Sequence, residues 1–271
     1  MLVNKTPLFI RGSILTKEML AAMRDYPIDL IELGFINRGD GILAGFLIQF
    51  QRGTLIVGRG IFKYKDSIYV LTEEHPVKIP IDSGNYVLKI VVEDERLESN
   101  ELGDYKCREF QMILDTLEPL KENEIELCRL GYSGQGSEVV SRYETFSDFH
   151  IVSNLVDIKH VRYADHSRVG TLHPIILKTF AKDMIKKSNL DAIDSVFVLQ
   201  CLNAEFISRE CIIAYLNLKA KKTHSKDNLE NIEIYQLLRE ILEETRDKTT
   251  GIDNEEKQIQ TQTKRQSIEV F

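Results

Sequence analysis

Short apolar segments, rich in β-branched residues, follow one another from Gly41 to Val92 and are separated by glycine, Lys-Asp or proline. None of them is long enough for a typical helix, and this alternation is typical of strands joined by tight turns. The pattern predicts a β-meander with strands at 41–50, 54–60, 61–64, 67–71 and 86–92. A module of this kind offers a rigid surface and free strand edges, which favours a scaffold or binding role.

The N-terminal sequence predicts a strand at 7–11, followed by a short docking helix that Thr16 caps and that Pro27 ends. Two further strands are expected at 110–114 and 124–130. We therefore expect a β-rich domain over residues 1–146. In its last strand, Glu126 and Arg129 alternate with apolar residues, which predicts one face in water.

The apolar period changes to 3.6 residues after Pro174, which suits the first position of a helix. Four amphipathic helices are expected: from Pro174, over 192–202, after a Ser208 cap, and around 234–242. The whole chain is therefore predicted to be α+β, with a connector at 147–173, a helical domain at 174–245 and a polar C-terminal tail at 246–271. The tail has too few apolar residues to fold alone, so we expect it to order only on a partner.

The charge balance narrows the choice of partners. The 271 residues carry 42 acidic and 35 basic side chains, a formal charge of -7, which argues against a broad nucleic-acid surface. The longest apolar run, 41–50, is about half of the roughly 20 residues that span a bilayer, and the first residues show no signal-peptide pattern. We expect synthesis in the cytoplasm and no membrane insertion.

Enzyme and cofactor signatures are missing from the sequence. It has no P-loop, no H-E-x-x-H helix and no strand-linked G-x-G-x-x-G. In the loop 131–137, Ser133 follows Gly131 by two residues, but Gln135 stands where a nucleophile elbow needs its second glycine. No cofactor and no catalytic residue is expected, and the protein is predicted not to be an enzyme.

The sequence also shows no metal-binding pattern. Four cysteines, Cys107, Cys128, Cys201 and Cys211, form no C-x-x-C pair and are expected to be reduced core residues. His160, Asp165, His166 and His173 are suitable ligand types without a metal-binding spacing, so no metal is expected. An alternative stays open: a ligand- or carbohydrate-binding module, or a hydrolase, that uses the 131–137 loop together with the His160–His173 region. Such a site requires the two regions to converge on one pocket.

Four segments follow one another in an order that resembles a known group of proteins: Asp40–Gly45, Leu55–Gly60, Tyr69–Leu71 and Gly84–Leu88. It is similar to the D-G-(apolar)-x-G, V-x-x-G and Y-V-L progression of baseplate and fibre-attachment proteins in contractile phage tails and phage-tail-like bacteriocins. The later segments 124–129 and 199–203 resemble accessory proteins from tail modules of Gram-positive prophages.

This resemblance implies a structural baseplate or fibre-attachment component of a contractile injection system, made in the bacterial cytoplasm and located in a virion or tail-like particle. Its implied partners are other tail or baseplate subunits, in several copies. Two candidate interfaces follow from the sequence: the surface around Gly41, Gly45, Gly58 and Gly60, and the end of the tail at Ile268, Val270 and Phe271.

Overall fold

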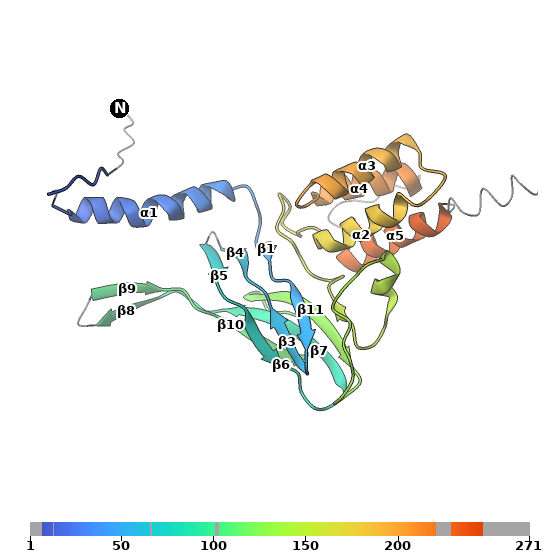
Figure 1. The fold of residues 1–271 in the computed structure, drawn as a ribbon, viewed down its shortest axis with the longest axis horizontal. Coiled ribbons are helices and arrows are strands. Elements are labelled where there is room, and N and C mark those ends of the chain that lie inside the picture. Colours follow the sequence, from blue (N-terminus) through green and yellow to red (C-terminus); the bar gives the residue numbers. More distant parts are fainter. Residues whose placement is uncertain (1–6, 13, 66, 101–102, 221–228, 246–271) are drawn as a thin grey trace, which may run out of the picture.

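The computed structural model describes residues 7–12, 14–65, 67–100, 103–220 and 229–245. An N-terminal arm, a β-domain and a group of helices follow one another along the chain (Figure 1). Helices and strands occupy separate stretches of the sequence, which is typical of an α+β fold. The predicted fold class is confirmed. Among the described residues, no helix is long and apolar enough to cross a bilayer.

The N-terminal arm, residues 7–36, contains helix α1 (Lys17–Gly34). Its predicted cap is confirmed, because Thr16 Oγ1 accepts a hydrogen bond from the amide of Met19 at 3.3 Å. The predicted end at Pro27 is wrong, since the helix continues through that residue. Proline removes a backbone donor, but on this exposed helix water can satisfy the carbonyl that loses its partner. The predicted strand at 7–11 is also wrong, because those residues pair with no other segment as a strand.

Two small antiparallel sheets replace the single predicted meander. One has the order β1-β4-β5 and the other β2-β3-β6. The strands are β1 (Gly41–Gly45), β2 (Ile48–Gln51), β3 (Thr54–Val57), β4 (Gly60–Tyr64), β5 (Ser67–Leu71) and β6 (His75–Lys78). The predicted strand at 41–50 is split between the two sheets because Phe46 adopts a left-handed backbone, with φ 55, and buries its ring in the core.

A larger antiparallel sheet has the order β10-β7-β11-β12. Its strands are β7 (Gly84–Val92), β10 (Phe110–Thr116), β11 (Glu124–Tyr132) and β12 (Val156–Asp157). The predicted wet face of β11 is wrong: Glu126 is buried, and its carboxylate accepts hydrogen bonds from the Arg129 guanidinium at 2.8 and 3.1 Å. A register shift between Glu126 and Cys128, opposite β7, breaks the alternation on which the prediction depended.

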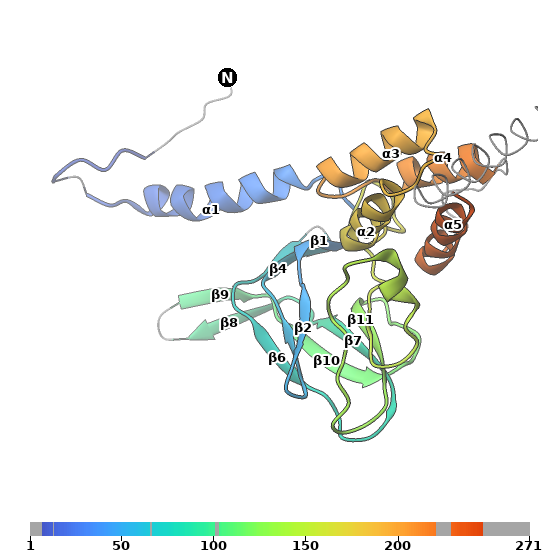
Figure 2. The same ribbon diagram turned by 45° about the vertical axis from the view of Figure 1, so that its right-hand side comes forward.

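A two-stranded ribbon, β8 (Arg96–Asn100) and β9 (Gly103–Cys107), was missed by the sequence analysis. It leaves the β-domain on the same side as α1 in both views (Figures 1 and 2). Its described side chains are mostly exposed. Leu97 is the one apolar residue of β8, and in β9 Tyr105 and Cys107 alternate with Asp104 and Lys106, so the sequence pattern is weak.

The helical part matches the predicted elements closely. A 3-10 turn, η1 (Phe146–His150), precedes α2 (Pro174–Met184), α3 (Ala192–Asn203), α4 (Arg209–Ala220) and α5 (Asn231–Glu244). Pro174 takes the first helical position, and Ser208 Oγ accepts a hydrogen bond from the amide of Cys211, as expected. Aromatic rings of η1, α2 and α5 pack together: Phe146 lies 5.6 Å from Phe180 and 4.9 Å from Tyr235 between ring centroids.

The stretch 147–173 is packed against both neighbours. Its apolar side chains, among them Val156, Val161 and Leu172, belong to a hydrophobic core that also includes strand and helix residues. The fully buried Arg209 anchors this stretch to the helices. Its guanidinium donates to Gly170 O at 2.9 Å, to Asn231 Oδ1 at 2.7 Å and to Leu229 O. The division into domains with a separate connector stays a prediction, but this connector has many more contacts than a free linker.

Candidate interaction surface

The base of the N-terminal arm is held firmly by the body of the protein. Lys63 Nζ donates hydrogen bonds to Arg38 O at 2.8 Å and to Phe35 O at 3.3 Å. His166 Nδ1 lies 3.0 Å from Asn37 O, and the Arg38 guanidinium stacks 3.8 Å from the centroid of the Phe206 ring. Backbone and side-chain contacts therefore fix residues 35–38. The direction in which α1 leaves the β-domain follows from this anchor.

Along α1, apolar side chains form one wide stripe. At 3.6 residues per turn they cover roughly 160° of the helix surface, which is wider than a two-stranded coiled-coil seam. We call this set the α1 stripe: Met19, Leu20, Met23, Tyr26, Pro27, Leu30, Ile31 and Leu33. No residue of α1 is buried, and Leu30 and Leu33 are 60% and 64% exposed. The apolar half of this amphipathic helix thus lacks a partner within the described chain.

The acidic side of α1, formed by Glu18, Asp25, Asp29 and Glu32, lies opposite the stripe. Its C-terminal end faces the β-domain. Asp29 and Glu32 border a shallow groove with Lys63 and Ile68, and Glu32 is 4.0 Å from the Arg108 guanidinium. Leu33, at the edge of the stripe nearest the acidic side, borders the same groove. The rest of the stripe lies on the opposite side of the helix from these carboxylates, and Figures 1 and 2 show α1 projecting from the β-domain.

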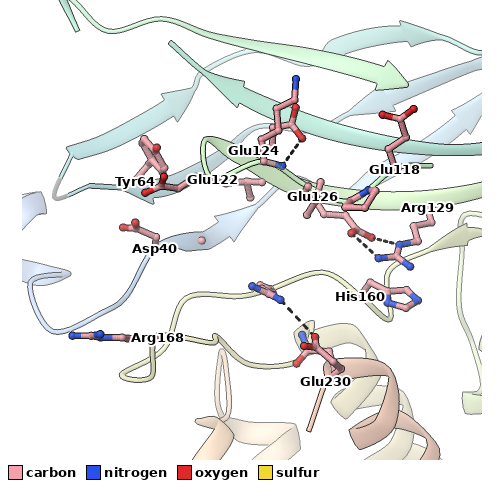
Figure 3. Close-up of a pocket in the computed structure, with 17 residues that line it drawn as sticks. Asp40, Tyr64, Glu118, Glu122, Glu124, Glu126, Arg129, His160, Arg168 and Glu230 are labelled. Carbon is pink, nitrogen blue, oxygen red and sulfur yellow. Dashed lines mark hydrogen bonds and ion pairs between the residues drawn. The ribbon is translucent and has the colours of Figure 1, made fainter. Parts of the chain in front are cut away.

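A second feature is a polar cleft of about 530 Å³, lined by residues from the β10–β11 turn, β11, the segment before α2 and the start of α5 (Figure 3). Part of its charge is paired. Glu124 binds Lys89 at 3.0 Å, Glu126 binds Arg129 at 2.8 Å, and Arg162 lies 3.5 Å from Glu230. Burial lowers the pKa of His160 in its wall, and the nearby Arg129 acts in the same direction.

The cleft is lined mainly by carboxylate and cationic side chains. Its described lining contains no serine, threonine or cysteine that could act as a nucleophile. The carboxylate of Glu124 has its pKa lowered, against the effect of burial, by bonds to the Lys121 amide and to Lys89, which is opposite to the shift a general acid needs. The paired charges of the cleft join β7 to β11, lie within β11, and link the segment before α2 to the N-cap of α5.

The residues of the alternative hydrolase or ligand-binding hypothesis lie in different places. Ser133 in the 131–137 loop is tied to Asn154, whose Oδ1 accepts from its amide at 2.9 Å. His160 borders the polar cleft, His166 anchors the arm, and His173 is buried as the N-cap of α2. In the part of the chain that the structure describes, no group of three or more His, Cys, Asp or Glu side chains could hold a metal ion. Among the described residues, the 131–137 loop and the His160–His173 region do not converge on one pocket.

The predicted interface glycines have internal roles in the described chain. A Cβ at Gly60 would lie 2.3 Å from the Phe46 ring, and one at Gly45 would lie 2.1 Å from Arg59 O. Gly41 and Gly58 likewise approach the backbone of Arg162 and Leu47 closely. These contacts explain the glycines by packing, so an interface there stays a prediction. Ile268, Val270 and Phe271 lie outside the described residues, and their predicted contact is likewise untested.

The strongest candidate surface, the C-terminal half of the α1 stripe, was missed because the helix was expected to stop at Pro27. A signal was present in the sequence. Leu30, Ile31 and Leu33 continue the spacing of Met19, Met23 and Tyr26 by three and four residues across the proline.

Comparisons with known proteins give only weak similarities. No protein-family model and no curated protein matches the chain. A crystal structure of TssK aligns with 88% of this chain and 72% of its own, at 11% identity and a TM-score of 0.42. A cryo-electron-microscopy structure of the type VI secretion system TssK-TssF-TssG baseplate subcomplex aligns with 88% of this chain and 99% of its own, at 11% identity and a TM-score of 0.37.

A third structure, the baseplate complex from the type VI secretion system, aligns with 89% of this chain and 100% of its own, at 11% identity and a TM-score of 0.31. At these identities and TM-scores, the similarity carries no argument about function.

Proposed function

We propose that this chain is a structural subunit that assembles with other proteins through its N-terminal arm. The observation that carries the proposal is the α1 stripe, which is exposed on an anchored helix and, apart from Leu33, lies away from the groove between α1 and the body. Large contiguous apolar surfaces on soluble proteins mark interaction sites, because leaving them in water is unfavourable. The acidic opposite side of α1 makes an anionic lipid surface an unsuitable partner, so a protein groove fits better.

The particle in which it works is a contractile phage tail or a phage-tail-like particle, with a role in baseplate assembly or fibre attachment. The glycine-punctuated pattern between Asp40 and Leu88, which resembles baseplate and fibre-attachment proteins, supports this part of the proposal. Most of those glycines are used for internal packing, so the arm, and not the glycine surface, is the contact we propose.

The test is incorporation into particles. Tyr26→Glu with Leu30→Glu places two charges on the stripe, where burial against a partner would leave them unpaired. We expect particles purified from the producing bacterium to contain at most a tenth of the wild-type amount of the variant chain. Val152→Glu is the matched control, since Val152 is 90% exposed and lies far from α1 in the sequence. Normal incorporation of the double variant, or particles that lack the chain altogether, would contradict the proposal.

A further inference from the structure

A second apolar surface that the described residues leave exposed lies on α3. This helix carries apolar side chains on both sides: Phe197, Val198 and Cys201 are buried, while the opposite side faces solvent. We call the exposed set the α3 outer face: Ile193, Val196, Leu199 and Leu202. Val196 and Leu199 are 59% and 66% exposed. Ser195, Gln200 and Asn203 lie on the same exposed side, so the outer face is an apolar ridge among polar residues. Four large apolar side chains exposed along one helix suit an interaction site.

We infer that the α1 stripe of one copy of this chain packs on the α3 outer face of a second copy. The inference rests on the proposed assembly role and names the partner of the arm. Each copy carries one stripe and one outer face, so a single kind of contact covers both surfaces. Such a head-to-tail contact joins different surfaces of the two copies and produces a ring or an open chain.

The surfaces match in the geometry of their rows. The α3 outer face is a ridge of residues spaced by three: 193, 196, 199 and 202. On α1, stripe residues lie in rows spaced by four: 19-23-27-31 form one row, and 26-30, continued by the small Ala22 and Gly34, form the next, with a groove between them. A ridge of the first kind fits a groove of the second with the helix axes inclined by about 20°, which allows a long contact. Two α3 ridges facing each other would cross near a right angle and touch over a shorter length.

The available areas also suit a modest interface. With roughly 150 Å² for a large apolar side chain, the stripe exposes on the order of 500 Å² and the α3 outer face about 300 Å². A small standard interface buries about 600 Å² on each partner, of which somewhat more than half is apolar. We therefore expect association in the micromolar range, strengthened inside a particle where many copies are held together.

The arm cannot make this contact with its own α3. Lys63, Arg38 and His166 fix the base of the arm, and α1 runs away from the helices, as Figures 1 and 2 show. The described contacts of α1 with other elements are mainly with β5. A second copy has no such restriction.

The experiment is sedimentation velocity on the full chain between about 1 and 100 μM, the range expected for an interface of this size. We expect the wild-type mass to rise with concentration beyond a dimer. Leu30→Glu removes the stripe and Leu199→Glu removes the outer face, so each variant alone should stay monomeric. An equimolar mixture should form a dimer that grows no further, because one intact stripe and one intact outer face remain. Val152→Glu, the control, should behave as wild type.

Each other outcome is decisive. A single variant that still dimerises would show contact between like surfaces, and a mixture that stays monomeric would overturn the pairing. If the wild-type chain is monomeric at every concentration while the stripe variants are still lost from particles, another subunit covers the arm. In that case this inference fails and the proposed function stands.

Discussion

Helices α1 and α2 follow the same amphipathic pattern but differ completely in burial. α2 buries six side chains, among them Phe180 and Met184, against η1, α3 and α5, whereas α1 buries none. The pattern of apolar residues shows that a helix needs a partner but does not say where that partner is. For α2 the partner lies in the same chain. For α1, the described part of the chain buries no side chain of the helix, and we propose that the partner is another subunit.

The largest expected effect comes from removing a ring from the packed helix. Phe180 is fully buried and lies 5.6 Å from Phe146 and 6.1 Å from Phe197 between ring centroids. Phe180→Ala should lower the free energy of unfolding by about 3 to 5 kcal/mol, because it removes apolar contacts and leaves a cavity. Leu30→Ala on α1 should change it by less than about 0.5 kcal/mol. Urea unfolding followed by circular dichroism measures both; similar losses in the two variants would show that α1 is packed.

The second largest effect is expected at Arg209 in the packed helices, in contrast to Arg24 on α1. Arg209→Met leaves the Gly170 and Leu229 carbonyls and the Asn231 side chain without this buried donor. We expect a loss of about 3 kcal/mol, since a buried charged group that is removed leaves its partners unsatisfied. Arg24→Met on α1 is the control, because Arg24 pairs with Asp25 in open solvent and should not alter stability measurably. An Arg209→Met variant with an unchanged free energy of unfolding would mean that the hydrogen bonds of Arg209 do not hold the 147–173 stretch to the helices.

The sequence predicted the regular elements well and the exceptions poorly. Periodicity located α2 to α5 and most strands, because their apolar faces are buried within the chain and the pattern reports that burial directly. It failed at Pro27, Phe46 and Glu126. Each departure depends on the surroundings: an exposed helix tolerates a proline, a buried ring holds a left-handed residue, and a register shift turns a carboxylate inward.

The candidate site was harder to predict than the fold. The base of the arm, which sets the direction of α1, is held by Lys63, Arg38 and His166. These residues come from three separate segments, and nothing in the sequence around each of them indicates that they meet. The hub at Arg209 was missed for the same reason, since an arginine at the start of a helix is ordinarily a surface residue. The apolar residues of the stripe were visible in the sequence. Their exposure was not, because exposure is decided by what the rest of the chain leaves uncovered.

Lowering the pH should reduce the free energy of unfolding of the packed region by a smaller amount than either substitution. Burial lowers the pKa of His173 to about 3, while in the unfolded chain a histidine titrates near 6.5. Below pH 6.5 the unfolded state therefore binds a proton that the folded state does not, and stability falls until the folded pKa is reached. This contribution amounts to about 2 kcal/mol between pH 7 and pH 5.

The variant His173→Asn keeps a side chain able to cap α2 and removes the titration. Burial also lowers the pKa values of His150 and His160, which act in the same direction, so the comparison of interest is wild type against variant. Urea unfolding at pH 7 and pH 5 should show a smaller loss in the variant. Equal losses would place the acid sensitivity on other groups.

The smallest effect gives the sharpest comparison, because the two regions contain matched caps. Thr16 Oγ1 on α1 and Ser208 Oγ on α4 each accept a hydrogen bond from the amide three residues on, at 3.3 Å in both cases. Ser208→Ala should lower the free energy of unfolding by about 1 kcal/mol, the usual cost of losing a hydroxyl cap, since α4 unfolds with the core. Thr16→Ala should cost the first turn of α1 a similar amount locally. If α1 frays independently, however, the urea midpoint should not move, and only the helical signal of the native protein should fall.

A Thr16→Ala variant whose midpoint shifts as far as that of Ser208→Ala would mean that α1 unfolds together with the domains. The arm would then be an integral part of the fold, and not an independently folded helix that is available to bind a partner.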